Sequence, residues 1–218
     1  MKHTFFLSFL FSLLLIISST VSSARAQDYY GNSYAYKPVS FGLTFSPNLS
    51  WLNFGNDANV QKESEFAYGY GLLADFAFAE NYYFATGFLI NNLKSAVERG
   101  PDRISTMYKL QYVEIPIGLK LKSTQRYFRS YYGQFGFTGG LKINGEYAEN
   151  DGAYQDLDSE AKNIRLALNI GGGVEWQLDH NLRFVTGLSY NNGFTKILDR
   201  DLMGPKNSYL AVNLALFF

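Results

Sequence analysis

The sequence predicts an all-β fold, an eight-stranded antiparallel up-and-down transmembrane β-barrel. Three observations predict it: apolar and polar residues alternate over eight segments, long and short connections alternate between them, and the chain ends in an apolar strand. A period of two residues places alternate side chains on opposite faces of a strand. A sheet that spans a membrane must close on itself, because unpaired backbone groups find no water in the bilayer.

The last predicted strand, Asn207–Phe218, is the element on which the rest of the prediction depends. Its more apolar face forms a candidate barrel-insertion signal made of Leu210, Val212, Leu214, Leu216 and Phe218. Its other face is small or polar except at two aromatic ends, and carries Tyr209, Ala211, Asn213, Ala215 and Phe217. An apolar strand that ends on an aromatic residue resembles the C-terminal signal of bacterial outer-membrane barrels. Outer-membrane lipid and, during assembly, the barrel-insertion machinery are therefore expected partners.

The N-terminus predicts a secretory signal peptide over residues 1–26. A short basic region at Lys2 and His3 precedes an apolar run, Phe5–Ile17, and Ala24-Arg25-Ala26 supplies a small-x-small cleavage site. The alternative is a membrane anchor helix, but the apolar run is shorter than the roughly 20 residues that a spanning helix needs. The sequence therefore predicts export and cleavage before Gln27.

The rest of the chain divides into a polar, tyrosine-rich lead-in at residues 27–38 and a barrel at residues 39–218. Cleavage would leave 17 of the 19 basic residues against 19 acidic ones, a net charge of −2. Nucleic acid is not an expected partner, since it calls for a basic stripe. The absence of cysteine excludes disulfides and thiolate chemistry.

Eight segments show the alternation and are predicted to be strands. They are Val39–Trp51, Phe66–Phe78, Tyr82–Lys94, Tyr108–Lys122, Tyr131–Tyr147, Lys162–Leu178, Leu182–Phe194 and Asn207–Phe218. The first has the clearest pattern, because small polar residues separate Phe41, Leu43, Phe45, Leu49 and Trp51. Since membrane strands need roughly 9–11 residues to cross, these segments are long enough to span and protrude.

The connections between these strands alternate in length. Tight turns are predicted at Ala79–Asn81, Ser123–Arg129 and Asp179–Asn181, and long loops at Asn53–Glu65, Glu98–Arg103, Ala148–Glu160 and Lys196–Lys206. Outer-membrane barrels have an even strand number, short periplasmic turns and longer extracellular loops. The pattern thus predicts a barrel of OmpA-like size in the outer membrane, with its long loops outside the cell.

Charged residues on the polar faces indicate which face points inward. A soluble lipocalin-like barrel would share the period but turn its apolar face inside. The polar faces carry a predicted lumen charge network of Asp75, Glu114, Lys120, Lys142, Glu146, Arg165, Glu175 and Arg183. A barrel of this size is about wide enough for side chains to fill, and isolated charges there are costly. We therefore expect these residues to form ion pairs that plug the lumen.

Searches for catalytic and metal-binding patterns favour a non-enzymatic protein without cofactors. The predicted mature chain has one histidine, His180, in a periplasmic turn, where a solvated turn residue is expected rather than the base of a Ser-His-Asp site. The predicted mature chain has no cysteine and a single histidine, so it lacks the histidine and cysteine ligands of a typical transition-metal site. The acidic loop at 148–160 is a candidate calcium ligand, but it lacks the spacing of a calcium-loop motif and is interpreted as a solvated loop.

Two backbone features are expected to distort strands locally. Gly171-Gly172-Gly173 has no following lysine and lies within a predicted strand, so close backbone packing or a bend is expected rather than a phosphate loop. Pro116 has no N–H to donate in a barrel that has no edge strand. We expect a bulge or local distortion at Pro116, facing the lumen.

The fourth and fifth predicted strands contain Tyr112-Val113-Glu114-Ile115-Pro116 within Leu110–Lys122, continuing to Tyr132–Gly136. This hairpin resembles the PorT-type outer-membrane β-barrel family of Bacteroidetes. The resemblance implies a small barrel of a family whose members mostly have no assigned function, and whose namesake is an accessory of type IX secretion and gliding. It implies no catalytic residues.

The sequence leaves three functions open. The first is a non-enzymatic barrel with a polar, plugged lumen, for which an accessory role in contact with cell-envelope or secretion proteins is one option. The second is a narrow, porin-like channel for small solutes. The third, which the lack of a histidine at the outer rim disfavours, is an outer-membrane enzyme acting on lipid or peptide.

Overall fold

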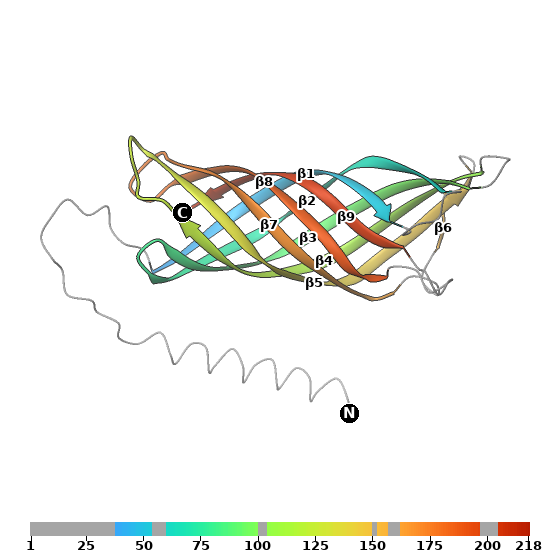
Figure 1. Ribbon diagram of the computed structural model, residues 1–218, viewed down its shortest axis with the longest axis horizontal. Coiled ribbons are helices and arrows are strands. Elements are labelled where there is room, and N and C mark those ends of the chain that lie inside the picture. The colour runs from blue at the N-terminus through green and yellow to red at the C-terminus, as the bar shows by residue number, and fades with distance from the viewer. Residues whose placement is uncertain (1–37, 54–59, 100–103, 150–151, 157–161, 197–204) are drawn as a thin grey trace, which may run out of the picture. The chain divides into compact units, whose positions relative to one another are not determined.

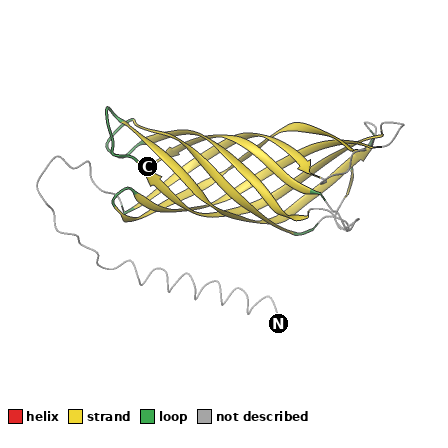
Figure 2. Ribbon diagram, in the orientation of Figure 1, coloured by secondary structure: helices red, strands yellow, loops and turns green. Residues whose placement is uncertain are grey.

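The computed structural model describes residues 38–53, 60–99, 104–149, 152–156, 162–196 and 205–218. Figures 1 and 2 show that these residues form one antiparallel barrel. Its eight long strands are β1 (Val39–Asn53), β2 (Val60–Ala79), β3 (Tyr82–Arg99), β4 (Ile104–Lys122), β5 (Arg129–Glu149), β7 (Ile164–Gln177), β8 (Arg183–Lys196) and β9 (Lys206–Phe217). No helix among these described residues has the length and hydropathy of a membrane span.

Each long strand pairs with its neighbours along the chain, and the pairing of β1 with β9 closes the sheet. The register joins Leu43 to Leu216 across this seam, so the last strand completes the barrel wall. The predicted eight-stranded antiparallel barrel is confirmed. A two-residue strand, β6 (Gln155–Asp156), pairs with β5 inside the predicted third loop.

The strands differ from the predicted ones mainly at one end of the barrel. β2 begins at Val60 and β4 at Ile104, four to six residues before the apolar alternation starts, so the first predicted loop is shorter than expected. Backbone pairing continues there although the side chains are polar, because backbone hydrogen bonds rather than the side-chain pattern define a strand. We call this end the loop end, and the end with the turns at Glu80–Asn81, Ser123–Phe128 and Leu178–Leu182 the turn end.

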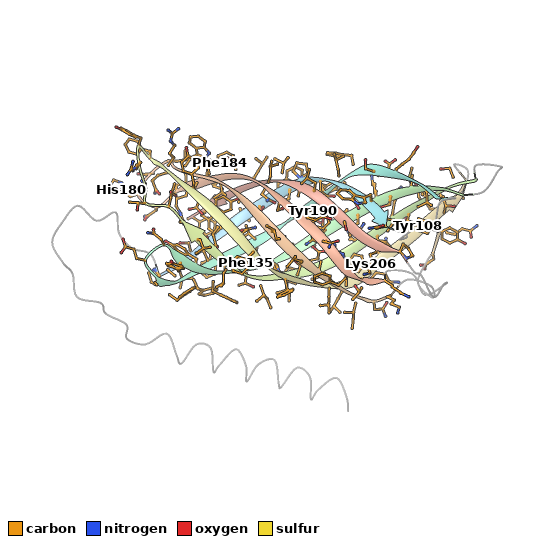
Figure 3. The ribbon with its side chains drawn as sticks, viewed as in Figure 1. Tyr108, Phe135, His180, Phe184, Tyr190 and Lys206 are labelled. Atoms are coloured by element: carbon orange, nitrogen blue, oxygen red, sulfur yellow. The ribbon has the colours of Figure 1, made fainter. Side chains whose placement is uncertain are left out.

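The apolar residues face outward, as the alternation predicts. Phe41 and Leu166 keep 54% and 49% of their surface exposed, whereas Arg165 and Glu175 inside the barrel keep 1% and 3%. Figure 3 shows Phe135 and Tyr190 among the side chains along the barrel wall. A soluble barrel with an apolar interior would have the opposite arrangement, so this reading is excluded.

The last strand follows the same rule. Leu210, Val212 and Phe218 are exposed, whereas Tyr209 and Phe217 are buried inside the barrel. The five residues of the candidate insertion signal thus lie on the outer face of β9.

A β-bulge on β5 changes which side chains face the lumen. Gln111 pairs with Asn144 and Tyr112 pairs with Lys142, so Ile143 is an extra residue in this strand. A bulge of one residue moves every following side chain to the opposite face. Strict alternation therefore fails beyond Ile143 towards the loop end.

The two predicted backbone distortions are both present. A Cβ atom at Gly173 would collide with the carbonyl oxygen of Thr186 on β8, so the predicted close packing is confirmed. At Pro116 the pairing of β4 with β3 is interrupted between Glu114 and Ile117 without a change of register. The hydroxyl of Thr86 donates a 2.8 Å hydrogen bond to the Pro116 carbonyl. Pro116 lines the lumen, as predicted. Because the register is the same on both sides of Pro116, the distortion is local and is not a full bulge.

The predicted signal peptide and nearly all of the predicted lead-in lie outside the described residues. Pro38 is the exception, because its carbonyl oxygen accepts a 2.8 Å hydrogen bond from the Ala77 amide of β2.

Candidate functional site

The interior of the barrel is layered along its axis. The inward residues of β1 pass through the layers in order, from Ser40 at the turn end through Thr44, Ser46 and Asn48 to Leu52 at the loop end. Ser40 pairs with Asp75 in a charged layer, Thr44 and Ser46 line a cavity, and Asn48 belongs to a polar network. Leu52 packs in an apolar layer.

The charged layer nearest the turn end is a cluster of three cations and two carboxylates. We call it the turn-end cluster, and its members are Asp75, Lys120, Lys122, Glu175 and Arg183. Lys120 Nζ lies 2.7 Å from Asp75 Oδ2 and 3.1 Å from Glu175 Oε1. Lys122 Nζ and Arg183 Nη1 approach Glu175 Oε2 at 2.9 and 3.1 Å. The cluster joins β2, β4, β7 and β8, so it crosses much of the lumen.

Aromatic rings surround the turn-end cluster. Lys120 Nζ lies 5.0 Å from the ring centroid of Tyr132 and 4.9 Å from that of Phe217. Lys122 lies 3.9 Å from the ring of Tyr83. The rings exclude water while offering their negative faces to the cations, which stabilises buried positive charge.

The second polar layer is built on one ion pair, between Glu114 of β4 and Arg165 of β7. We call it the arginine network, with Glu114, Arg165, Asn91, Asn191 and Tyr209 as its members. Arg165 Nη1 donates to Glu114 Oε1 at 2.7 Å, and both side chains are fully buried. The Tyr209 hydroxyl and the Asn91 amide each donate to Glu114 Oε2 at 3.2 Å.

Neutral groups complete the hydrogen bonding of Arg165. Its Nη2 donates to the side-chain carbonyl of Asn191 and, at 3.4 Å, to the backbone carbonyl of Asn207. Its guanidinium carbon lies 5.4 Å from the ring centroid of Tyr209. Since Tyr209 on β9 and Glu114 on β4 come from opposite sides of the barrel, their hydrogen bond crosses the lumen.

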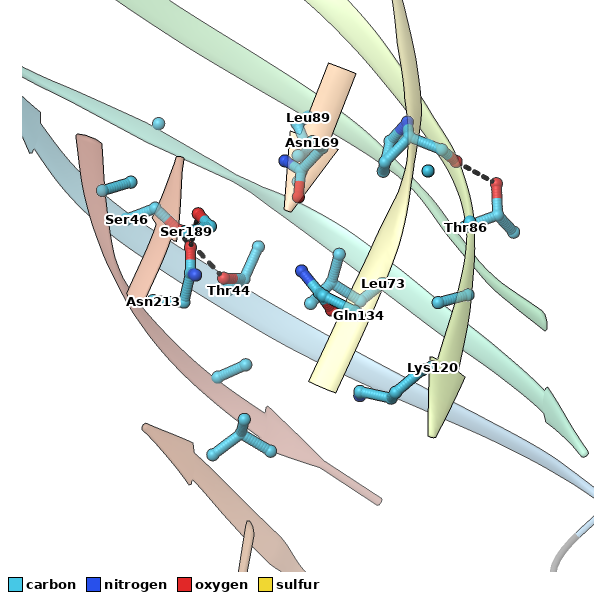
Figure 4. Close-up of a pocket in the computed structure, with 18 of the residues that line it drawn as sticks. Thr44, Ser46, Leu73, Thr86, Leu89, Lys120, Gln134, Asn169, Ser189 and Asn213 are labelled. Carbon is cyan, nitrogen blue, oxygen red and sulfur yellow. Dashed lines mark hydrogen bonds between the residues drawn. The ribbon is translucent and has the colours of Figure 1, made fainter. Parts of the chain in front are cut away.

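A cavity of about 110 Å³ lies between these two layers (Figure 4). Its lining includes Thr44, Ser46, Gln134, Ser189 and Asn213. The Ser46 and Ser189 hydroxyls both donate to Asn213 Oδ1, at 3.2 and 3.3 Å. Apolar side chains such as Leu73, Leu89 and Val185 make up most of the lining, and the cavity is large enough to hold several water molecules at its polar groups.

Towards the loop end the lumen is filled by apolar side chains. This apolar layer consists of Leu52, Leu93, Val97, Leu110 and Tyr112, packed with Tyr209 and Ala211. An apolar layer therefore blocks the lumen near the loop end, and the turn-end cluster blocks it near the turn end.

Six of the eight residues in the predicted lumen charge network lie in the two charged layers. They are Asp75, Lys120, Glu175 and Arg183 in the turn-end cluster and Glu114 and Arg165 in the arginine network. Lys142 is also on the inner face, opposite the buried Tyr112.

Glu146 was placed wrongly by the prediction. It pairs with Lys109 and with Asp156 of β6 on the outer face, because the bulge at Ile143 reverses the alternation before it is reached. Its carboxylate accepts a 3.5 Å hydrogen bond from the side-chain amide of Asn144, which lies at the exposed outer face beyond the bulge.

Lys122 is the charged member of the lumen that the sequence reasoning missed. It lies two residues after Lys120 on the same strand face, so extending the alternation to the last residue of the predicted strand would have found it. The neutral members of the arginine network carried no comparable signal, because asparagine and tyrosine are uncharged and are also found at exposed positions.

His180 lies in the exposed turn between β7 and β8. Its backbone N–H donates to Asp179 Oδ1 at 2.7 Å, and its ring Nδ1 lies 3.2 Å from the same oxygen. The backbone N–H of His180, followed by its ring, lowers the pKa of the Asp179 carboxyl below its usual value. Figure 3 places His180 at the turn end of the barrel.

Within the described ranges, no group of three histidine, cysteine or acidic side chains is arranged to hold a metal ion. Residues 150–151 and 157–161 of the predicted acidic loop lie outside those ranges, so calcium binding there stays an untested prediction. Asp156 belongs to β6.

Comparison with known proteins places the chain in a family. A family model described as outer membrane protein beta-barrel domain matches residues 22–199, so the chain belongs to this family and to the outer membrane. None of the curated proteins matches it.

Two solved structures have a similar fold. Neisserial surface protein A is 11% identical with a TM-score of 0.51, covering 83% of this chain and 96% of that one. OprG from Pseudomonas aeruginosa is 10% identical with a TM-score of 0.51, covering 86% of this chain and 99% of that one. At such identities the similarity shows the barrel fold alone.

Proposed function

We propose that this chain is a non-enzymatic outer-membrane barrel with a plugged lumen, which acts through the surfaces at its two ends. The observation that carries the proposal is the hydrogen bond from Tyr209 to Glu114 across the lumen, together with the buried Glu114–Arg165 ion pair. A solute passing this layer would have to separate two buried charges. Breaking such a pair costs about 3–5 kcal/mol, so the closed arrangement is strongly favoured.

Recordings in planar lipid bilayers test the plug. The wild-type barrel is expected to give no stable conductance. The double variant Glu114→Ala, Arg165→Ala removes the ion pair that crosses the lumen, but the apolar layer and the turn-end cluster still close it, so the folded variant is also expected to give no stable conductance. Stable single-channel currents from the wild type would contradict the plug.

The cavity supports the second candidate function, a narrow channel for small solutes. The middle of the lumen is not filled by side chains, and hydroxyl and amide groups are present among the mostly apolar residues that line it. In that case the two charged layers would act as gates rather than plugs. Wild-type currents that increase in the double variant would favour this candidate.

A role as an accessory of cell-envelope or type IX secretion machinery is supported by the resemblance of the β4–β5 hairpin to PorT-type barrels. The length of strands β2 to β5 also supports this role. At the loop end these strands extend the barrel wall beyond the segment with apolar alternation, where a partner protein can reach it. Deletion of the gene, followed by assays of secretion and gliding, tests this role. Normal secretion and gliding would contradict it.

Export by a cleaved signal peptide belongs to the same proposal. The apolar run and the Ala24-Arg25-Ala26 site support it. N-terminal sequencing of the protein from isolated outer membranes is expected to begin at Gln27, and a protein that begins at Met1 would contradict cleavage.

A further inference from the structure

The turn-end cluster holds an uneven number of charges. Lys120, Lys122 and Arg183 carry three positive charges, and Asp75 and Glu175 carry two negative ones. The arginine network, in contrast, contains one cation and one carboxylate. The turn-end cluster therefore holds one positive charge more than its carboxylates balance, and four of its five side chains are at most 5% exposed.

Two of the three cations have N–H groups to spare. An ammonium group has three donors, and the acceptor within hydrogen-bonding distance of Lys122 Nζ is Glu175 Oε2 at 2.9 Å, with Asp75 Oδ2 farther away at 3.7 Å. Arg183 uses Nη1 for Glu175, and its buried Nη2 has no hydrogen-bond partner among the described residues. Both cations contact the same Glu175 oxygen, so they lie beside each other.

We propose that Lys122 and Arg183 bind a small monovalent anion at the turn-end mouth of the lumen. One negative charge would cancel the excess charge of the cluster and accept the open N–H groups. Both changes are favourable where water is largely excluded, because an unpaired buried charge or donor is costly. This site is independent of whether the lumen conducts.

The surroundings limit the size and the route of the anion. Arg183 keeps 18% of its side chain exposed, so the site is reached from the turn end. The rings of Tyr83 and Phe217 lie against the two cations, with Lys122 3.9 Å from the first centroid and Arg183 5.2 Å from the second. These walls favour a compact ion such as a halide over a polyanion or a lipid headgroup.

Bromide is a suitable probe, because its anomalous scattering identifies it in a crystal. Crystals of the folded barrel soaked in sodium bromide are expected to show an anomalous peak within hydrogen-bonding distance of Lys122 Nζ and Arg183 Nη2. The absence of a peak at this position would overturn the proposal, whatever the outcome of the conductance measurements.

A pair of variants separates a built site from an adventitious ion. Lys122→Met makes the cluster neutral and is expected to remove the peak and to weaken bromide-dependent thermal stabilisation. The half-saturating bromide concentration should rise by about tenfold or more, as for the loss of a charged hydrogen bond. Arg126→Met, which removes an exposed cation at the same end of the barrel, should change neither result.

A peak that persists in Lys122→Met would identify an adventitious ion only and overturn the proposal. If Lys122→Met does not assemble, Arg183→Gln removes the other open donor and serves as the second variant. Heat-modifiable migration in gels reports whether each variant is folded.

Discussion

The two charged layers of the lumen bury charge in different ways. In the turn-end cluster each carboxylate is close to more than one cation, and Glu175 alone contacts Lys120, Lys122 and Arg183. In the arginine network Glu114 has a single cationic partner, Arg165, and its remaining hydrogen bonds come from neutral groups. The difference is one of redundancy: the first layer can lose a cation and stay paired, and the second cannot.

The largest effect is expected from Arg165→Met. This substitution leaves the buried carboxylate of Glu114 without a counter-charge, and the free energy of unfolding should fall by about 3–5 kcal/mol. Urea unfolding of the barrel from lipid vesicles measures the loss. In the double variant Glu114→Gln, Arg165→Met no charge is left unpaired. More than half of the free energy of unfolding that Arg165→Met loses should therefore return. A double variant as unstable as Arg165→Met would show that the charge is not the cause.

A smaller effect is expected from Lys120→Met in the turn-end cluster. Two cations remain for two carboxylates, so the expected loss is about 1–3 kcal/mol, the range for removing a hydrogen bond to a charged group. The same unfolding measurement gives the value. Equal losses in Lys120→Met and Arg165→Met would remove the distinction between the two layers.

Gly187→Ala tests the aromatic wall of the turn-end cluster without changing a charge. A Cβ atom at Gly187 would collide with the hydroxyl of Tyr132, whose ring lies beside Lys120, and with the backbone carbonyl oxygen of Gly172 on β7. Overpacking of this kind should cost about 1–3 kcal/mol in the unfolding assay. Gly133→Ala is the matched control, because a Cβ atom there has no neighbour within 4 Å. Equal stability of the two variants would contradict the close packing of Gly187 against Tyr132 and the Gly172 carbonyl.

The smallest effect is expected at the exposed turn, where water screens the charge. The Asp179 carboxyl should titrate below the ordinary aspartate pKa of about 3.9, because the His180 backbone N–H favours its ionised form. Any stability that it contributes is present above that ordinary pKa and is lost as the pH falls through the lower, folded value. NMR titration of the Asp179 carboxyl carbon measures this pKa, and a value at or above 3.9 would contradict it.

The alternation of the sequence is a good predictor of which face a residue occupies, as long as a strand is uninterrupted. Phe41 and Leu166 are outside and Arg165 and Glu175 inside, as expected, because the side-chain period of a strand is two. Glu146 shows the limit: one extra residue at Ile143 reverses the pattern, and nothing in the local sequence marks this position as a bulge.

The partners of each buried charge were not predictable in the same way. Glu114 meets Tyr209, 95 residues later in the chain, because barrel closure places β4 opposite β9. Contacts across a lumen depend on the stagger of all eight strands, and an alternating pattern does not contain that stagger. The clustering of Lys122 with Glu175 depends on the same property.

The sequence by itself determined the strand number, the closed barrel and the outward direction of the apolar faces, because these follow from a period of two and from the need to satisfy every backbone group in lipid. The tertiary structure alone decided how the inward charges are divided, into a neutral pair in one layer and an excess of one cation in the other. The physical reason is that the stagger of the strands sets which charges share a layer, and one bulge decides which of them reach the lumen at all.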